Sequence, residues 1–205
     1  MKEKFYRTLR EHFVKLETRL NQLDAVIGDG DHGTTLLKGL TAISNSKLPP
    51  AKAFRAETGG ASGSLFSILV GAIDEAIDNS SNFGQILSDA VKKISTIGDA
   101  KEGDKTMVDA LVPAAKAALE KPIDALKEAS IASKAGASKT IDMAARKGRA
   151  KYVENGGVGH IDPGAFSSSE IDNVGVIVIE KVSKGQDCGC WIMEDDSSSK
   201  VKSEA

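Results

Sequence analysis

The sequence predicts an all-α protein in which amphipathic and buried helices pack as a bundle. Six segments before residue 170 carry apolar residues at the three- and four-residue spacing of a helix, and this part shows no alternating strand pattern. Clusters of glycine, proline and aspartate separate the segments, as expected for turns between helices. Without a sheet to cover, the apolar stripes are buried by packing helix on helix.

The first two helices flank an aspartate-rich connection. The segment 5–23 has the apolar stripe of an amphipathic helix that runs directly into Asp24, so we expect this aspartate to end the helix. A second helical pattern covers 34–43. Residues 45–50 then supply turn chemistry with two prolines.

A long apolar helix is predicted in the middle of the chain. The segment 65–77 is too long for a typical strand and apolar on most sides, which is typical of a helix buried in a core. Further helical patterns cover about 84–96, 106–119 and 122–147, and the last two are rich in alanine. Breaker residues separate these patterns.

The end of the chain is the least regular part. Residues 173–182, NVGVIVIEKV, have the β-branched content of a strand. A lone strand would have no partner, and Ser169 followed by Asp172 fits a helix cap, so we favour a helix buried by its neighbours. We expect one domain over 1–183 and a small, charged, flexible tail over 184–205.

The composition excludes several classes of protein. The 205 residues include 27 basic and 29 acidic side chains, a net charge of -2, so there is no basic footprint for nucleic acid or anionic lipid. The N-terminus lacks the apolar core of a signal peptide, and no stretch approaches about 18 uninterrupted apolar residues. Cys188 and Cys190 have neither a disulfide-framework spacing nor the CxxC spacing, and we expect reduced thiols. We expect a cytoplasmic protein with no nucleic-acid or membrane partner.

Three aspartates crowd one helix connection. The stretch DAVIGDGDHGTTLLKGL, residues 24–40, contains Asp24, Asp29 and Asp31. Two unit charges about 4 Å apart repel by about 4 kcal/mol at an effective dielectric near 20, so converging carboxylates need a cation. Mg²⁺ prefers oxygen ligands and usually takes one or two carboxylates plus phosphates. The residues alone leave a second interpretation open, in which the aspartates are a solvated helix end, a turn residue and an N-cap.

Three other clusters lie at predicted helix ends. GGASG at 59–63 would offer backbone amides and a serine hydroxyl to an anion, although by itself a tight packing turn explains it better. GDAKEGDKTMVDAL at 98–111 again joins glycines to a helix start. RKGRAKY at 146–152 precedes GHIDPGA at 159–165, and Arg149 could clamp a phosphate, although an arginine at a helix end usually lies in solvent. Together, anion-binding turns and an acidic metal set fit a nucleotide with Mg²⁺.

In this order, the elements DxxxxGDxDHG, GGASG, GDKTM, GRAxY and DPGA resemble the nucleotide-binding L subunit, or C-terminal L domain, of dihydroxyacetone kinases. The resemblance runs from about Leu20 to Ala165 and implies a closed barrel of antiparallel helices with the nucleotide at one end. It implies that Asp24, Asp29 and Asp31 hold two Mg²⁺ ions at the phosphates of ADP or ATP. It also implies a set of nucleotide-binding residues: His32, Gly33, Thr34, Thr35, Ala61, Ser62, Gly98, Met107, Arg149, Asp162, Pro163 and Gly164.

The resemblance further implies a partner chain. In this family a separate K subunit or domain holds dihydroxyacetone and the L part presents the phosphate, so no covalent nucleophile is expected here. Some L parts exchange ATP; others retain ADP, which a phosphohistidine-carrying subunit rephosphorylates, and a free-standing chain favours this second mode. Two alternatives stay open, namely a non-catalytic nucleotide sensor of the same family and a metal-dependent hydrolase whose aspartates activate water. The hydrolase would leave GGASG and GDKTM without a role.

Overall fold

The computed structural model describes residues 1–183, and this part of the chain is helical without any strand, as the sequence predicts. The predicted tail over 184–205, with both cysteines, lies outside the described residues. The described chain contains eight α-helices: α1 (Lys2–Ile27), α2 (His32–Asn45), α3 (Pro50–Glu57), α4 (Gly60–Asp78), α5 (Phe83–Gly98), α6 (Val108–Glu120), α7 (Ala125–Lys139) and α8 (Pro163–Ser183). It also contains five 3-10 helices: η1 (Ser80–Asn82), η2 (Pro122–Asp124), η3 (Thr140–Asp142), η4 (Arg149–Tyr152) and η5 (Glu154–Gly157).

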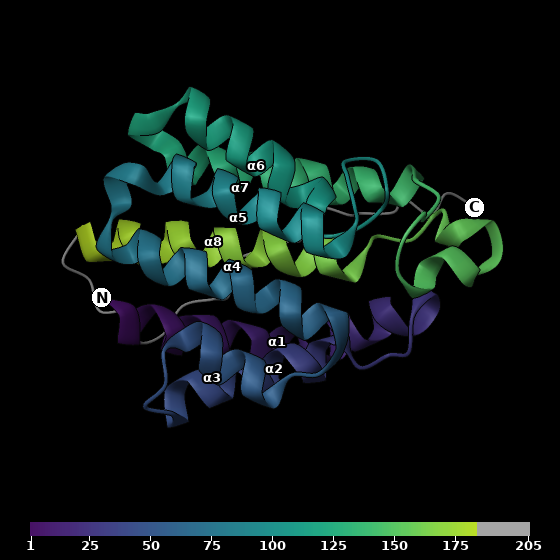
Figure 1. Ribbon diagram of the computed structural model, residues 1–205, viewed down its shortest axis with the longest axis horizontal. Coiled ribbons are helices and arrows are strands. Elements are labelled where there is room, and N and C mark those ends of the chain that lie inside the picture. The colour runs from purple at the N-terminus through teal and green to yellow at the C-terminus, as the bar shows by residue number, and fades with distance from the viewer. Residues whose placement is uncertain (184–205) are drawn as a thin grey trace, which may run out of the picture.

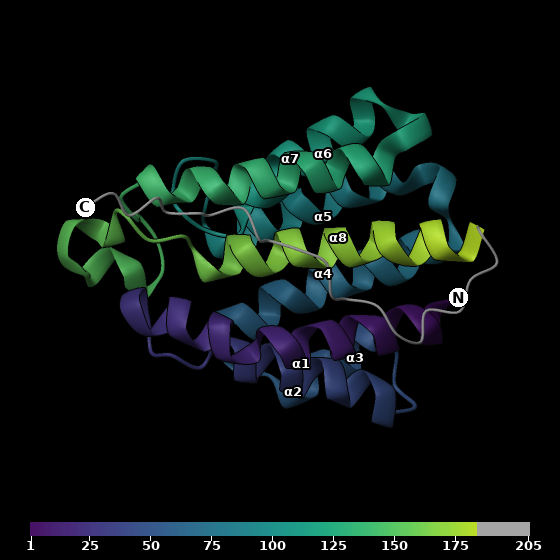
Figure 2. The ribbon, with the colours of Figure 1, turned by 180° about the vertical axis from the view of Figure 1, so that it is seen from behind.

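The α-helices form a closed ring. Each helix from α1 to α7 packs against the next helix in the chain, and α8 packs back against α1. Figures 1 and 2 show the helices lying alongside one another along the long axis of the molecule. Helices that follow one another through short connections pack as antiparallel neighbours. The expected closed barrel is therefore confirmed.

The core lies inside the ring and takes apolar side chains from all eight α-helices. The largest are Phe13 on α1, Phe54 on α3 and Phe66 on α4, each no more than 2% exposed. Burying one such side chain contributes roughly 1.5–3 kcal/mol before the cost of ordering it. The apolar stripes in the sequence thus account for the ring, since each stripe faces its interior.

Helix α3 was not predicted from the sequence, which indicated only turn residues after residue 45. The second of the two prolines, Pro50, stands at the first position of α3, where its missing N–H costs nothing. Phe54 then anchors the helix in the core. Its ring lies so close to Gly39 of α2 that a Cβ at that glycine would come within 2.4 Å of it. The α2–α3 contact therefore depends on a residue without a side chain.

The predicted helix over 122–147 is too long, because α7 covers only 15 residues. Helix α7 ends at Lys139, and Thr140 is fully buried with its hydroxyl donating to Ala137 O. The amides of Ala145 and Arg146 donate to carbonyls of other loops instead of continuing a helix. Helix propensity of an alanine-rich segment is a weak force, and these tertiary contacts override it. Residues 173–182, by contrast, lie in a helix, which the sequence favours over a strand. This helix begins already at Pro163, so Ser169 and Asp172 lie inside it and do not cap it.

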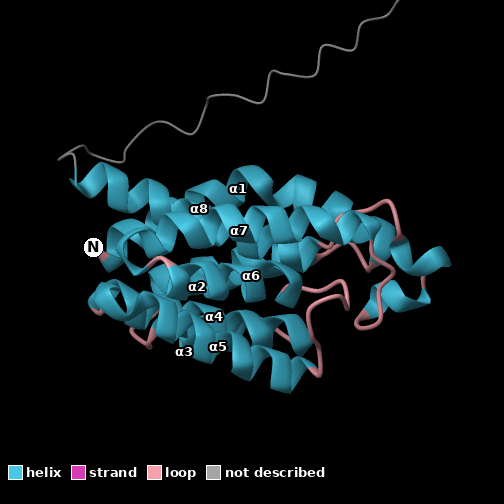
Figure 3. Cartoon of the chain, turned by 90° about the horizontal axis from the view of Figure 1, so that it is seen from above, coloured by secondary structure: helices cyan, strands magenta, loops and turns pink. Residues whose placement is uncertain are grey.

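The long connections gather at the end of the barrel away from the N-terminus. Figure 3 shows the longer loops at this end. At this end α1 continues past Asp24 to Ile27, because Ile27 is buried against Ala145 and Ala150. Asp24 therefore lies in the last turn of α1 rather than at its end. We call this part of the barrel the loop end.

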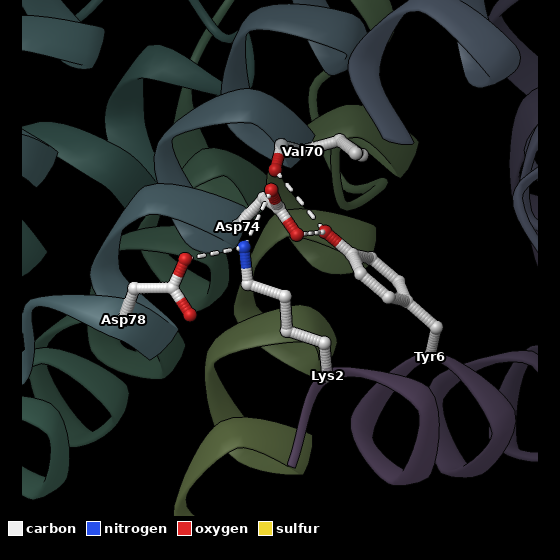
Figure 4. Close-up of polar contacts among 5 residues, drawn as sticks. All are labelled: Lys2, Tyr6, Val70, Asp74 and Asp78. Atoms are coloured by element: carbon white, nitrogen blue, oxygen red, sulfur yellow. Dashed lines mark hydrogen bonds and ion pairs between the residues drawn. The ribbon is translucent and has the colours of Figure 1, made fainter. Parts of the chain in front are cut away.

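The opposite end of the barrel is closed by polar contacts between α1 and α4 (Figure 4). Lys2 Nζ lies 2.9 Å from an oxygen of Asp74 and 2.7 Å from an oxygen of Asp78. The hydroxyl of Tyr6 donates to Asp74 at 3.3 Å and contacts the carbonyl of Val70 at 3.5 Å. The start of α1 is thus attached to the last turns of α4, far from the loop end.

Helix α4 bears on the sequence-based expectation that no stretch is apolar enough to span a membrane. Among the described helices it alone is long and apolar enough, by length and composition, to cross a membrane. That is weak evidence, because core helices of soluble proteins meet the same criteria. Here α4 packs between α3 and α5 as part of the ring.

Candidate functional site

The three aspartates converge at the loop end. Asp24 comes from the last turn of α1, Asp29 from the connection, and Asp31 from the N-cap position of α2. One carboxylate oxygen from each lies within 4.8 Å of the others. Asp24 is fixed by the amides of Gly30 and Asp31, which donate to its Oδ2 at 2.8 and 3.1 Å. The connection reaches this position because Gly30 adopts a φ of +80°, which favours glycine.

These contacts decide between the two interpretations of the aspartates. Asp31 occupies the N-cap position of α2 but makes no capping hydrogen bond. Asp29 pairs with Arg149, whose Nη1 lies 2.6 Å from its Oδ2. One aspartate thus makes no capping bond, and another pairs with an arginine. Such a carboxylate cluster is a suitable donor set for a hard divalent ion such as Mg²⁺. The geometry therefore favours a cation site over simple helix capping.

A cavity of about 520 Å³ opens beside the aspartates. Its wall includes all three aspartates and most of the other residues predicted for the site: His32, Thr35, Ala61, Ser62, Gly98, Met107, Arg149, Asp162, Pro163 and Gly164. A larger groove of about 800 Å³ crosses the outer face of α3, α4 and α5, but among the described residues the group of three converging acidic side chains lies at the loop-end cavity and not in this groove. Volume alone does not identify a site, and convergent polar groups do. We take the loop-end cavity as the candidate site.

Gly33 and Thr34 do not line this cavity. A Cβ at Gly33 would lie 2.4 Å from the carbonyl oxygen of Glu17, so this glycine lets α2 approach α1 closely. The hydroxyl of Thr34 donates to Glu17 and accepts from Asn21, and the Thr34 amide also donates to Asn21. Both residues thus hold the start of α2 against α1, beside the carboxylates.

The GGASG stretch forms the N-terminus of α4 at the cavity wall. Gly59 is its N-cap, and no side chain caps the helix there. Gly60 has a φ of +67°, and residues 59–62 all line the cavity. The first amides of a helix lack partners within it and carry its positive dipole end, so they attract anions. This end of α4 can receive a phosphate.

Sequence reasoning missed Lys105, a fully buried lysine in the cavity wall. Its ammonium donates to the carbonyls of Thr140 at 2.6 Å and His160 at 2.5 Å, which joins two loops. Burial lowers its pKa, and the carboxylate of Asp162 acts in the opposite direction. Its φ of +59° is rare for a residue with a side chain and is typical of functional sites. The only sequence signal was its position within the GDKTM element.

Two buried titratable groups stand beside Lys105 and the aspartates. Burial raises the pKa of Asp162 to about 7, and its Oδ1 accepts from the amide of Ala165 at the start of α8. Burial lowers the pKa of His32 to about 4, so this ring is neutral at pH 7. Its Nε2 lies 2.9 Å from the hydroxyl of Ser167 on α8. His32 therefore joins α2 to α8 by hydrogen bonding and supplies no positive charge to the cavity.

The cavity wall combines polar and apolar groups. The polar groups include the aspartates, the α4 N-terminus and Arg149, and the apolar groups are Leu65, Phe66, Ile94, Met107 and Val108. A ligand with a flat apolar portion and an anionic portion matches this composition.

Comparison with known proteins agrees with the fold and the motifs. Residues 26–173 match the DAK2 domain family. The dihydroxyacetone kinase of Citrobacter freundii is 35% identical over 166 residues, which are 73% of this chain and 30% of that enzyme. The ADP-binding subunit DhaL of the PEP-dependent dihydroxyacetone kinase of Escherichia coli is 33% identical over 173 residues, which are 72% of this chain and 81% of that subunit.

A solved structure gives the same result. The C. freundii dihydroxyacetone kinase in complex with AMP-PNP and Mg²⁺ superposes with a TM-score of 0.68 at 28% identity, over 86% of this chain and 33% of that one. This chain thus spans about a third of the C. freundii enzyme. With a family match over most of its length and relatives above 30% identity, the chain belongs to the DAK2 domain family.

Proposed function

We propose that this chain is the nucleotide-binding subunit of a dihydroxyacetone-type kinase, which transfers a phosphoryl group from Mg²⁺-bound ATP, or through bound ADP, to dihydroxyacetone or a related small ketose. One observation carries the proposal. Three carboxylates, the uncapped N-terminus of α4 and Arg149 meet in one cavity whose wall also includes apolar side chains. The names of the relatives, an ADP-binding subunit among them, support it.

The composition of the cavity wall suggests how a nucleotide lies. Its phosphates would face the aspartates and the α4 amides of Ala61 and Ser62, and its base would pack near Ile94 and Met107. Asp24, Asp29 and Asp31 would hold one or two Mg²⁺ ions, which offset the charge that spreads over the phosphoryl oxygens during transfer.

The chain's own residues would act by positioning and by electrostatics. Phosphoryl transfer needs no covalent intermediate on the protein, and its largest catalytic contributions come from orientation and charge stabilisation. Arg149 is the cation best placed to contact a phosphoryl group, since its guanidinium lies at the aspartates and presents several donors in one plane. Lys105 would keep the loops around Asp162 in place.

The acceptor would be supplied by a partner. The E. coli relative, which this chain matches over 81% of its length, is a subunit. The name of that relative supports a K-type partner that holds the ketose. We propose in addition a phosphohistidine-carrying subunit as the donor that rephosphorylates retained ADP.

The first experiment asks whether nucleotide and Mg²⁺ bind together. We expect calorimetry to show ADP binding that depends on Mg²⁺, and Asp29→Ala to weaken it by more than the roughly 10–100-fold that an outer-shell change costs. Asp89→Ala, on the exposed face of α5, is the matched control and should bind normally. Equal affinities in the two variants would contradict the proposal.

A second experiment separates the kinase from a sensor. Mass spectrometry of the purified protein asks whether ADP accompanies it, which would favour the phosphohistidine-dependent mode over ATP exchange. An assay with a K-type chain and dihydroxyacetone then asks whether phosphoryl transfer occurs. A protein that binds nucleotide and transfers nothing would be a sensor.

A further inference from the structure

We propose that Arg149 and a divalent cation compete for the carboxylate of Asp29, so that cation binding frees Arg149 to contact the anionic groups of the ligand. The inference rests on the proposed function and adds a coupling within the same site. Arg149 would thus weaken the binding of the cation alone and strengthen the binding of the cation together with a phosphate.

The first observation is that the carboxylate of Asp29 belongs both to an ion pair and to the carboxylate cluster. One of its oxygens lies 2.6 Å from Arg149 Nη1, an ion pair with a charged hydrogen bond. The same side chain belongs to the carboxylate cluster with Asp24 and Asp31. A cation bound to Asp29 offsets the negative charge of the carboxylate, and this weakens its attraction for the guanidinium of Arg149.

The ion pair is of a kind that yields to a cation. The Arg149 side chain is 70% exposed and that of Asp29 is 41% exposed. Water screens exposed pairs, and their strength is small. A divalent ion held by three carboxylates carries twice the charge of the guanidinium and interacts more strongly with the Asp29 carboxylate. Exchange is therefore favourable and reversible.

The backbone around Arg149 stays attached when the side chain is released. Ala150 is buried and packs with Ile27 at the end of α1. The Arg146 amide donates to the carbonyl of Asp104, and Lys147 pairs with Asp99 at 2.6 Å. A freed Arg149 side chain thus remains at the cavity wall, within reach of an anion bound there.

The coupling has a defined sign. Because Arg149 competes with the cation, removing it should raise the affinity for the cation alone. Because Arg149 contacts the phosphate afterwards, removing it should lower the affinity for the cation and nucleotide together. A residue that only stabilises the loop would not produce opposite effects on these two measurements.

The test uses Mn²⁺ as the cation, since its binding can be followed by electron paramagnetic resonance. For Arg149→Met we expect a 2- to 5-fold tighter binding of Mn²⁺ alone and at least a 10-fold weaker binding of ADP with Mn²⁺. Lys147→Met is the matched control, because it removes one positive charge from the same cavity wall while leaving the Asp29 pair in place. It should change Mn²⁺ affinity by less than half as much on the logarithmic scale.

Three results would overturn the inference. Equal effects of the two variants on Mn²⁺ binding would mean that general charge, and not the ion pair, is responsible. Weaker Mn²⁺ binding in Arg149→Met would mean that Arg149 supports the cation site. If the unmodified protein binds neither Mn²⁺ nor ADP, the proposed function fails as well, which distinguishes that outcome from the first two.

Discussion

Asp172 on α8 is a buried acid outside the candidate site. It is 4% exposed, and its Oδ2 has no hydrogen-bond partner among the described residues. The hydroxyl of Ser133 on α7 lies close to this carboxyl group and opposes the rise in its pKa. Burial raises the pKa of Asp172 to about 7, so the folded protein holds a proton there that the unfolded chain releases near pH 4.

The raised pKa predicts a loss of stability with rising pH. Between about pH 4 and pH 7 Asp172 keeps its proton in the folded state and has lost it in the unfolded state, so this group makes the free energy of unfolding fall as pH rises. His32, whose pKa is lowered to about 4 in the folded state, acts in the opposite direction. We expect Asp172→Asn to remove roughly 2–3 kcal/mol of this fall between pH 5 and 7, measured by urea denaturation. Asp162, whose pKa is also about 7, accounts for a similar remaining fall. The exposed Asp89→Asn is the control, and an Asp172→Asn protein with the full wild-type slope would refute the prediction.

At the level of single residues, the sequence was sufficient for side chains close to glycine-rich turns. The aspartates and the GGASG residues could be found because their spacing along the chain already places them at helix ends. Lys105 could not, because its role depends on the carbonyls of Thr140 and His160, which lie 35 and 55 residues away. Contacts of this kind are set by the tertiary fold and leave no local periodic signal.

At the level of helices, apolar periodicity predicted six of the α-helices and missed α3, and α8 was favoured because a lone strand would have no partner. Periodicity works for long segments such as α1 and α5, whose stripes repeat several times. It is weak for the eight residues of α3, whose burial rests on Ala53 and Phe54. The end of α7 was missed for another reason, since the loop over 143–148 is fixed by hydrogen bonds to Asp104 and Gly156.

The contact of α2 with α3 gives a prediction at this scale. A methyl group at Gly39 would lie 2.4 Å from the ring of Phe54, which is 1% exposed and has little room to move. We expect Gly39→Ala to lower the free energy of unfolding by roughly 1–3 kcal/mol, the cost of overpacking. Thermal or urea denaturation measures it.

Gly71→Ala is the matched control for that change. Gly71 also lies inside a helix, and a methyl group there would meet only Ala51 Cβ, at 3.3 Å. Alanine is better than glycine in a helix by up to about 1 kcal/mol, so Gly71→Ala should be neutral or stabilising. If both variants lost the same stability, the helix interior rather than the Phe54 contact would be responsible.

For the whole molecule, the ring separates stability from the chemistry proposed for it. At one end, Lys2 and Tyr6 attach α1 to α4 and serve the fold alone. At the loop end, the three aspartates and the uncapped N-terminus of α4 form the site proposed for a ligand. Sites built for ligand binding commonly reduce the stability of the free protein. The two ends should therefore respond differently to substitution.

Asp31→Asn tests this difference against Tyr6→Phe. Asparagine is as good an N-cap as aspartate and relieves repulsion from Asp24 and Asp29, so in EDTA we expect an unchanged or slightly higher free energy of unfolding. With Mg²⁺ and ADP at 100 times the dissociation constant, the wild type should gain about 2.7 kcal/mol and Asp31→Asn much less, because that variant loses a cation ligand. Tyr6→Phe should lose roughly 0.5–1.5 kcal/mol in both conditions and keep the full gain from ligand, since its hydroxyl bonds lie at the far end of the barrel. An Asp31→Asn protein that is destabilised in EDTA would show instead that this carboxylate serves the fold.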